Sequence, residues 1–225
     1  MRKVRTVAIV PSAGRGTRLG AGARKPFVRL AGKPLVAYAL KALQSCGSVD
    51  AIIVAAEPSC VGRIERLARR NRFTKVIAVV AGGKERSGSV RNCLKRVPPG
   101  CEVVLIHDAA RPFLKRRMIE DAVLAARRFG ACVAAVPETD TVKLAGRKMS
   151  VKRTLDRNSI FRAQTPQAFR WAIIKAAYGA GGKPRLTDDA AMVERAGGAV
   201  RIIPGSYRNI KITTREDLKI AEAFL

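Results

Sequence analysis

Five short runs of apolar, largely β-branched residues recur along this chain, separated by stretches whose apolar residues have helical spacing. The runs are Val7–Val10, Ile52–Ala56, Val76–Val80, Val103–Ile106 and Cys132–Val136. Continuous apolar runs of this length are typical of strands buried on both faces of a parallel sheet. Amphipathic helices are expected over Leu35–Cys46, Ile64–Arg70, Ser87–Arg96, Met118–Phe129 and Pro166–Ala177. The alternation predicts an α/β fold: a single Rossmann-like, mostly parallel sheet with helices on both faces.

Two further segments complete the predicted organisation. A closing helix is expected over Arg215–Phe224, where Thr213 and Glu216 have the spacing of a capping box. Thr141–Leu144 and Met149–Leu155 flank a glycine turn and predict a polar β-hairpin, part of an arm at about 138–160. A hairpin with so little apolar surface rarely stands alone in water. It is therefore expected either to form its own domain or to reach onto a partner subunit.

Composition limits the classes of protein that this chain can represent. With 48% hydrophobic and 27% charged residues and no linker-like tract, residues 1–225 are expected to form a single globular domain. No apolar run approaches the roughly 18 residues that cross a bilayer, and the start lacks the core of an export signal. We therefore expect a cytoplasmic protein with no membrane partner. Five dispersed cysteines without a C-x-x-C pair, and a single histidine, exclude an ordinary Cys/His zinc site.

The net charge is extreme, because 44 Lys and Arg residues less 17 Asp and Glu residues give +27. Such a charge attracts anions, including nucleic acid, without sequence specificity. It fits a phosphate-rich substrate, and a basic nucleic-acid-binding protein is an alternative of a different class. The chain has only 11 aromatic residues (7 Phe, 3 Tyr, 1 Trp) and no basic-aromatic motif. Specific binding of nucleic acid is therefore the less favoured reading.

A glycine-rich loop follows the first predicted strand. It reads Pro11-Ser12-Ala13-Gly14-Arg15-Gly16-Thr17-Arg18-Leu19-Gly20, and Lys25 follows. Such a loop is expected at the carboxyl edge of the sheet, where its backbone N–H groups can approach a phosphate. It is neither a P-loop nor a dinucleotide fingerprint, because its glycines are spaced G-x-G-x-x-x-G. Alone, the loop indicates a phosphate-binding turn or a merely structural one.

The whole series of motifs resembles that of one enzyme family. The loop from Pro11 to Arg18, followed by Lys25, looks like the nucleotide-binding loop of sugar-phosphate nucleotidyltransferases. The later motifs resemble those of the 2-C-methyl-D-erythritol 4-phosphate cytidylyltransferases of the non-mevalonate isoprenoid pathway. They are Gly82–Val90, His107–Pro112, Asp140–Lys143, Arg157-Asn158, Gln164–Gln167, Thr187–Ala190 and Asn209–Lys211. The resemblance implies the sheet of nucleotide-diphospho-sugar transferases, and transfer of CMP from CTP to the methylerythritol phosphate with release of pyrophosphate.

The resemblance also implies a role for each matching residue. The implied catalytic residues are Arg18, Lys25, Arg157 and Lys211. The implied nucleotide-binding residues are Pro11, Ser12, Ala13, Gly14, Gly16, Gly83, Lys84, Ser89 and Ala109, where a helix-capping role is the alternative for Ser89. The implied acceptor-binding residues are Asp108, Thr141, Arg157 and Lys211. Because a phosphate monoester is already ionised near neutral pH, the reaction needs positive charge and alignment more than a general base.

Residues near these motifs are expected to have structural roles. His107 is predicted to be a hydrogen-bonding residue and not a base, and Arg111 to anchor its loop. Asp188 and Asp189 are expected to favour a helix N-terminus through its dipole.

The family further implies a cofactor and an assembly. Mg²⁺ would be held mainly by the phosphates of CTP, without a cage of protein ligands. A homodimer through the arm would carry Thr141 and Arg157 to the active site of a partner subunit. A ribitol 5-phosphate cytidylyltransferase is the nearest alternative, because both acceptors are short polyol phosphates. A glycosyltransferase is less favoured, because Asp108 is followed by alanines and not by an acidic metal-binding motif.

Overall fold

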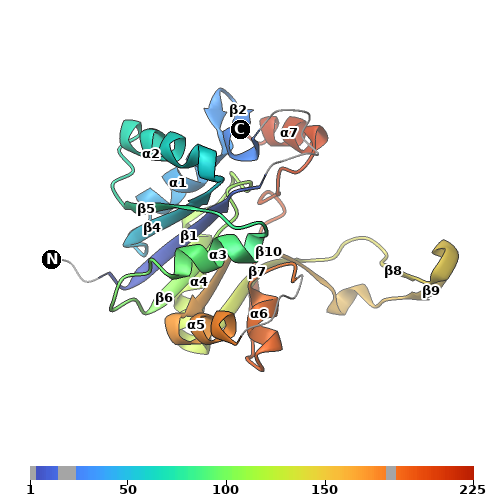
Figure 1. Ribbon diagram of the computed structural model, residues 1–225. Helices are drawn as coiled ribbons and strands as arrows, with labels where there is room; N and C mark the ends of the chain where they lie inside the picture. The colour runs from blue at the N-terminus through green and yellow to red at the C-terminus, as the bar shows by residue number, and fades with distance from the viewer. Residues whose placement is uncertain (1–3, 15–23, 181–185) are drawn as a thin grey trace.

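A seven-stranded sheet forms the centre of the computed structural model, which describes residues 4–14, 24–180 and 186–225 (Figure 1). The strand order is β11-β7-β10-β6-β1-β4-β5. The strands are β1 (Thr6–Ser12), β4 (Ala51–Ala56), β5 (Val76–Ala81), β6 (Val103–Ile106), β7 (Ala131–Pro137), β10 (Phe161–Arg170) and β11 (Arg201–Pro204). β10 runs antiparallel to β6 and β7, and the other neighbouring pairs are parallel. The predicted mostly parallel α/β sheet is confirmed.

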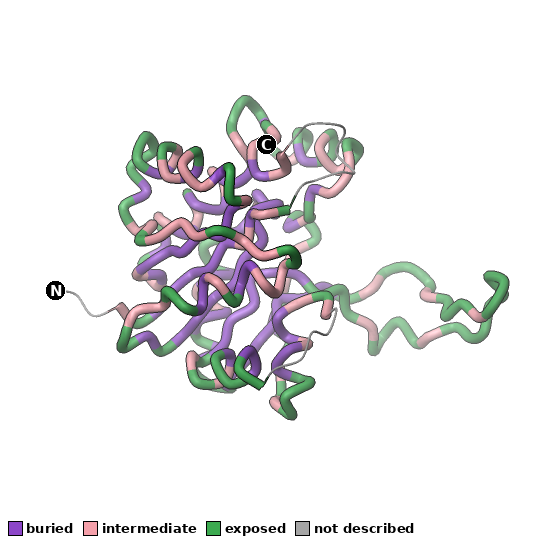
Figure 2. The backbone as a smooth tube through the Cα atoms, in the orientation of Figure 1, coloured by how far each residue is buried: buried purple, intermediate pink, exposed green. Residues whose placement is uncertain are grey.

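Helices cover both faces of this sheet, as predicted. One face packs against α1 (Leu35–Ser45), α2 (Val61–Arg70) and α4 (Arg116–Phe129), and the other against α3 (Arg86–Leu94), α5 (Trp171–Gly179) and α6 (Ala190–Arg195). In β1, Ala8 and Val10 join the first core while Val7 and Ile9 join the second. Because alternate side chains enter opposite cores, the strand is apolar at successive positions. Figure 2 shows the buried strands as the centre of the molecule.

A smaller apolar cluster joins the segment around β2 and β3 to the last part of the chain. β2 (Arg29–Leu30) pairs with β3 (Lys33–Pro34), and Leu30 packs with Ile212 and Ala221 of the segment containing α7 (Arg215–Glu222). The capping box of α7 uses Thr214 and Asp217. The predicted box of Thr213 and Glu216 is wrong by one residue. Asp217 accepts hydrogen bonds from the backbone N–H groups of both Thr213 (2.8 Å) and Thr214 (2.9 Å), which sets the register.

The helix predicted over Pro166–Ala177 is wrong in its first part. The chain remains a strand through Arg170, and α5 begins only at Trp171. The helix was predicted to begin at Pro166, and proline is common in the first turn of a helix. Here Pro166 lies in an interior strand, where the pairing with β7 shifts register between Ala163 and Gln167. A strand irregularity accommodates a residue that has no N–H to donate.

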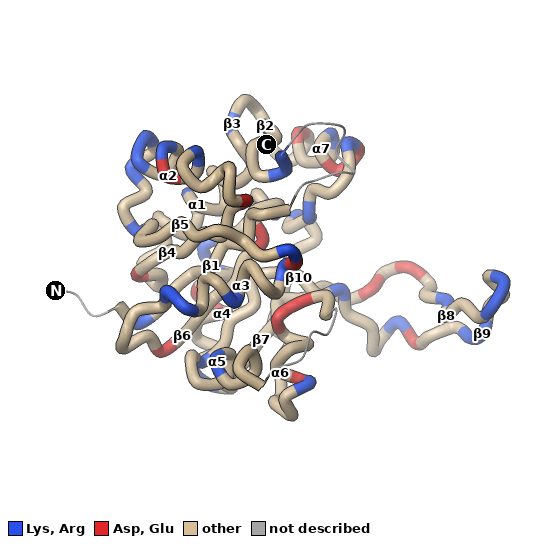
Figure 3. The backbone as a smooth tube through the Cα atoms, in the orientation of Figure 1, with Lys and Arg blue, Asp and Glu red and all other residues tan. Residues whose placement is uncertain are grey.

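The predicted arm extends from the body between β7 and β10 (Figures 1 and 2). β8 (Lys143–Ala145) and β9 (Val151–Thr154) pair antiparallel, and the 3-10 turn η4 (Arg147–Met149) joins them. Every residue of both strands is exposed. The other 3-10 turns among the described residues are η2 (Lys25–Phe27), η3 (Pro58–Cys60) and η5 (Arg157–Ser159). Figure 3 shows Lys and Arg residues concentrated near the distal end of the arm.

Two smaller observations concern the cysteines and the membrane. All five cysteines are buried as free thiols. Within the described ranges, no helix is both long and apolar enough to cross a membrane.

Candidate active site

A pocket of about 300 Å³ lies where β1, β5 and β6 end. Because these strands run parallel, their carboxyl ends meet at one edge of the sheet, the usual place for ligands in open α/β folds. The segment before α7 and the turn η2 complete the wall. The lining residues are Pro11, Ser12, Ala13, Gly14, Lys25, Pro26, Gly83, Lys84, Glu85, Arg86, Ser89, Asp108, Ala109, Ala110, Lys211 and Thr213.

Most of the implied site residues lie in this wall. They are Pro11, Ser12, Ala13, Gly14, Lys25, Gly83, Lys84, Ser89, Asp108, Ala109 and Lys211. Gly16 and Arg18 lie outside the described residues. Thr141 and Arg157 do not line the pocket of this chain: both are exposed on the arm, where Arg157 Nη1 donates to the carbonyl of Thr139 at 3.0 Å. Within the described residues, one chain therefore brings together most of the implied nucleotide-binding residues and only half of the implied acceptor-binding ones.

The loop after β5 lies directly against the loop after β1. A Cβ added at Gly82 would lie 2.4 Å from the Cβ of Ala13 and 2.9 Å from Ser89 Oγ, so only glycine permits this approach. Ser89 Oγ accepts the Gly83 N–H at 3.1 Å and donates to the carbonyl of Glu85 at 3.2 Å. The N-cap of α3 is Glu85, so Ser89 does not cap the helix. It shapes the pocket wall instead.

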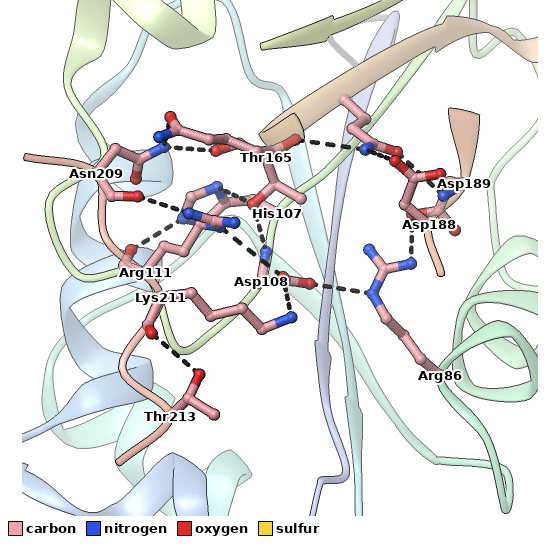
Figure 4. Close-up of polar contacts among 12 residues, drawn as sticks. Arg86, His107, Asp108, Arg111, Thr165, Asp188, Asp189, Asn209, Lys211 and Thr213 are labelled. Atoms are coloured by element: carbon pink, nitrogen blue, oxygen red, sulfur yellow. Dashed lines mark hydrogen bonds and ion pairs between the residues drawn. The ribbon is translucent and has the colours of Figure 1, made fainter. Parts of the chain in front are cut away.

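Asp108 lines the pocket and is the centre of a cluster of charges (Figure 4). Its Oδ1 lies 3.1 Å from Arg86 Nε, and its Oδ2 lies 2.8 Å from Lys211 Nζ. Arg111 Nε is 3.9 Å from Oδ2. Burial alone would raise the pKa of Asp108, but Arg86 and Lys211 outweigh it and hold the pKa well below its usual range. The pocket therefore presents an ionised carboxylate whose two oxygens are both held by cations.

Arg86 extends this cluster away from the pocket. Its Nη1 lies 2.7 Å from Oδ2 of Asp189, whose side chain is completely buried. Tyr178 donates its hydroxyl to Oδ1 of Asp189 at 2.6 Å. Burial would lower the pKa of Arg86, but Asp189 and Asp108 raise it overall and keep the guanidinium charged. Burial in turn raises the pKa of Asp189, and the Arg86 charge opposes that rise.

Arg86 and Asp189 were not identified as site residues from the sequence. Asp188 behaves as expected for a helix start, because it accepts the N–H of Ala191 at 3.0 Å. The Asp189 carboxylate makes no capping bond and pairs with Arg86 instead. One signal was available: Arg86 is the first residue of α3, where the helix dipole disfavours a cation. A basic residue at that position indicates a compensating carboxylate nearby.

His107 has the structural role that the sequence predicted. The ring is fully buried; its Nε2 donates to the carbonyl of Arg111 at 3.0 Å, and its Nδ1 accepts from Thr165 Oγ1 at 3.1 Å. Thr165 Oγ1 in turn accepts the N–H of Asp108 at 3.0 Å. Desolvation lowers the pKa of His107 to about 4, so the ring is neutral at physiological pH. Arg111 Nη1 donates to the carbonyl of Asn209 at 2.6 Å and anchors the loop that carries Lys211.

The similarity to known proteins covers almost the entire chain. Residues 6–225 match the model of the family described as IspD: 2-C-methyl-D-erythritol 4-phosphate cytidylyltransferase. Relatives of that name from Geobacillus thermodenitrificans (strain NG80-2) and Pelotomaculum thermopropionicum (strain DSM 13744 / JCM 10971 / SI) are 44% and 43% identical. The matches cover 97% and 98% of this chain and 96% and 94% of the relatives.

Solved structures give the same result. The 4-diphosphocytidyl-2C-methyl-D-erythritolsynthase from Anaerococcus prevotii DSM 20548 superposes with a TM-score of 0.87 at 29% identity, covering 98% of this chain and 96% of that one. The 2-C-methyl-D-erythritol 4-phosphate cytidylyltransferase from Thermus thermophilus gives 0.78 at 28% identity, covering 99% and 98%. On its sequence, fold and pocket, this chain belongs to the 2-C-methyl-D-erythritol 4-phosphate cytidylyltransferase family.

Proposed function

We propose that this chain transfers CMP from CTP to 2-C-methyl-D-erythritol 4-phosphate. The products are 4-diphosphocytidyl-2-C-methyl-D-erythritol and pyrophosphate, an intermediate and a by-product of isoprenoid precursor synthesis. Family membership supports the activity and the acceptor. The observation that carries the proposal is that residues implied for the nucleotide and for the acceptor line one pocket. Gly83 and Ser89 are on the nucleotide side, and Asp108 and Lys211 are on the acceptor side.

The chemistry needs two anions brought into line. A phosphate oxygen of the acceptor forms a new bond to the α-phosphorus of CTP, and the bond from that phosphorus to the bridging oxygen of pyrophosphate breaks. The acceptor phosphate has a second pKa of about 6, so its oxygen is already a nucleophile at neutral pH. Because the acceptor oxygen carries no proton, the reaction needs no general base. This agrees with the buried position of His107, whose ring is hydrogen-bonded inside the protein. Catalysis then depends on positioning and on positive charge at the α-phosphate.

The cations and small residues of the pocket divide this work. Lys25, in the pocket wall, and Arg18, from the glycine-rich loop, would stabilise the charge that develops on the α-phosphate. Gly83 and Ala109 leave room for the cytosine and ribose. Backbone groups there can distinguish the amino donor of cytosine from the carbonyl acceptor of uracil.

Asp108 and Lys211 form the acceptor side of the pocket. The ionised Asp108 carboxylate can accept hydrogen bonds from the hydroxyls of the polyol. Lys211 is 42% exposed and can turn from Asp108 toward the acceptor phosphate as a point charge. An acceptor that displaced this ion pair would gain both a carboxylate and an ammonium partner.

The arm would complete the acceptor side from a second copy of the chain, in a homodimer. Its apolar side chains lack a covering layer: Leu144 is 40% exposed, Met149 86% and Val151 62%. Thr141 and Arg157 at its base lie outside the pocket of their own chain. Arg157 offers a planar fork that suits a phosphate dianion. Light scattering on the full chain tests this assembly, and a monomer at micromolar concentration would contradict it.

Mg²⁺ fits this site as a cofactor held mainly by the phosphates of CTP. Mg²⁺ is usually bound by one or two carboxylates together with substrate phosphates, and Asp108 supplies a carboxylate in the pocket wall. The bound ion would neutralise charge on the triphosphate. Loss of turnover on chelation, and recovery with added Mg²⁺, would support this role. The cytoplasmic location stays a prediction.

Release of pyrophosphate tests the proposed reaction directly. The protein is incubated with 2-C-methyl-D-erythritol 4-phosphate and each of CTP, ATP, GTP and UTP. We expect release with CTP far above that with the other nucleotides, and no release with CTP would defeat the proposal. Replacing the acceptor with ribitol 5-phosphate separates the nearest alternative, because a strong preference for ribitol 5-phosphate would reassign the substrate.

A further inference from the structure

Two of the three nitrogens of the Arg86 guanidinium are paired with carboxylates of this chain. Nε lies 3.1 Å from Oδ1 of Asp108, and Nη1 lies 2.7 Å from Oδ2 of Asp189. Nη2 is buried, without a hydrogen-bond partner among the described residues. Arg86 lines the pocket, and its Nε and Nη1 each form an ion pair with a different carboxylate. Figure 4 shows the side chain lying between the Asp108 and Asp189 sides of the cluster.

Asp189 itself is fixed from several elements at once. Its side chain is completely buried, and Tyr178 of α5 donates to Oδ1 at 2.6 Å. Its backbone N–H and that of Ala190 both donate to Oε1 of Gln167 on β10, at 3.1 and 3.0 Å. A charge buried in this way is strongly unfavourable unless it is paired. Asp189 is therefore a rigid carboxylate whose cationic partner is Arg86.

We propose that Asp189 is a positioning residue for the transfer reaction, holding Arg86 so that Arg86 orients the Asp108 carboxylate toward the acceptor. Asp189 does not line the pocket and acts only through its neighbours. The inference rests on the proposed function, because it assigns Asp108 to the acceptor. Arg86 begins α3, the same segment as the Gly83–Ser89 wall. The bridge therefore ties the nucleotide wall to the acceptor carboxylate.

The physical reason for such a bridge is the precision that an in-line displacement needs. Asp108 is held at Oδ2 by Lys211, whose flexible side chain is 42% exposed. Arg86 supplies the rigid second contact at Oδ1, and its planar fork can span two carboxylates as an ammonium cannot. A misplacement of about 1 Å at a reacting group can cost on the order of 10²-fold in rate. Loss of Asp189 should therefore impair use of the acceptor while CTP still binds.

The test is a set of variants of the full chain assayed with 2-C-methyl-D-erythritol 4-phosphate and CTP. Asp189→Asn should lower kcat/KM for the acceptor by about 10- to 100-fold. The Kd of CTP, measured by calorimetry, should change by less than about threefold, since the nucleotide wall is retained. Arg86→Lys keeps the charge but loses the bridge, and should cause a similar loss. The double variant should be no worse than Arg86→Lys alone, because the two residues act in series.

Two further variants separate positioning from folding. Asp188→Asn changes the adjacent carboxylate, which bonds Gln167 and Ala191 but not Arg86. It should leave kcat/KM for the acceptor within about threefold of wild type. Tyr178→Phe removes only the hydroxyl that donates to Asp189 and should lower the same parameter by a smaller factor. This variant tests the proposal if Asp189→Asn does not fold.

Three results would overturn the inference. They are a folded Asp189→Asn variant with wild-type kcat/KM for the acceptor, additive losses in the double variant, and an equal loss in Asp188→Asn. The wild-type protein separates this inference from the proposed function. If it releases no pyrophosphate with this acceptor, the function fails. A crystal structure of Asp189→Asn then decides the inference alone, because an unchanged Arg86–Asp108 contact would contradict it.

Discussion

The arm and the charged cluster beside the pocket both contain basic residues, but those of the arm are exposed to solvent and the carboxylates of the cluster are buried. In the cluster, the side chains of Asp108 and Asp189 are 10% and 0% exposed, and each lies within 3.1 Å of an arginine or lysine nitrogen. On the arm, the basic residues are exposed to solvent. They are Lys143, Arg147, Lys148, Lys152, Arg153 and Arg157. Exposed ion pairs contribute little, whereas buried ones fix geometry because breaking them is costly.

This difference indicates what each region needs from outside the chain. The cluster carries its own compensating charges, so one chain is enough to build it. The arm has exposed apolar residues next to its cations and holds Thr141 and Arg157 away from the pocket. It is the region expected to gain order and function from a second copy. Substitutions should therefore affect catalysis and stability in the cluster, and assembly in the arm.

Asp108→Asn should have the largest effect on activity. The amide removes the charge shared by Arg86 and Lys211, and it turns an acceptor of hydrogen bonds into a donor on one side. We expect kcat/KM to fall by about 10³-fold in a pyrophosphate-release assay.

The matched control for this change is an exposed carboxylate. Glu120→Gln removes a charge on α4 whose partner Arg116 lies 2.7 Å away on the surface. Its activity should equal that of wild type. If Asp108→Asn kept more than about a tenth of the activity, the cluster would be structural and not part of the acceptor site.

Much of the fold, but not all of it, could be predicted from the sequence. Strands such as β1 and β6 lie between two helical layers, so their continuous apolar residues identify them. β10 was not predicted, because its buried positions include Gln164, Thr165 and Gln167, whose side chains are all hydrogen-bonded inside the protein. Polarity on a buried strand depends on partners from elsewhere in the chain, and a local pattern contains no trace of those partners.

The candidate site shows the same limit. Motif resemblance placed Asp108 and Lys211 together, and they lie 2.8 Å apart. The pairing of Arg86 with Asp189 joins α3 to the start of α6, two elements without a shared motif or periodicity. The position of Arg86 at a helix start indicates a nearby carboxylate, but the identity of that carboxylate follows from the topology of the sheet and is visible only in three dimensions.

The free energy of unfolding of the protein should depend on pH through His107. The pKa of this ring is lowered to about 4 in the folded protein, while an unfolded histidine has a pKa of about 6.5. Between these values the unfolded chain binds a proton that the folded one excludes, so stability falls as the pH falls. We expect a loss of about 3 kcal/mol in the free energy of unfolding between pH 7 and pH 4, relative to His107→Gln.

Urea unfolding of both proteins at the two pH values measures this difference. Titration of exposed carboxylates affects both proteins equally and cancels. The pKa of Asp108 is lowered in the folded protein, so protonation of this group in the unfolded chain near pH 4 also reduces stability, but both proteins contain Asp108 and the contribution cancels. Parallel pH profiles for wild type and His107→Gln would show that the buried ring does not limit stability.

The arm and the cluster can be tested against each other by mixing two inactive variants. Arg157→Ala removes the exposed guanidinium of the arm, and Lys211→Ala removes the ammonium of the pocket; each should cost roughly 10²-fold in turnover. If each arm serves its partner, co-expression should restore about a quarter of the wild-type activity, because a mixed dimer holds one complete site. No recovery would mean that Arg157 acts within its own chain, and the proposed division between the regions would fail.

The smallest effect is expected at the tip of the arm, where Met149→Ser removes the most exposed apolar side chain. Met149 has φ +59°, and its neighbour Lys148 has φ +57°, so both occupy left-handed backbone in the same turn. Lys148→Ser is therefore a matched control that changes charge and not apolar surface. Met149→Ser should weaken the dimer by about tenfold, since burial of a methionine contributes roughly 1.5–3 kcal/mol and its contact is only partial.

Sedimentation of each variant over a concentration series measures the dissociation constant of the dimer, and that of Lys148→Ser should stay within about threefold of wild type. Equal dissociation constants for Met149→Ser and wild type would mean that the arm tip remains in solvent, and the exposed apolar residues would then lack the partner that distinguishes the arm from the cluster.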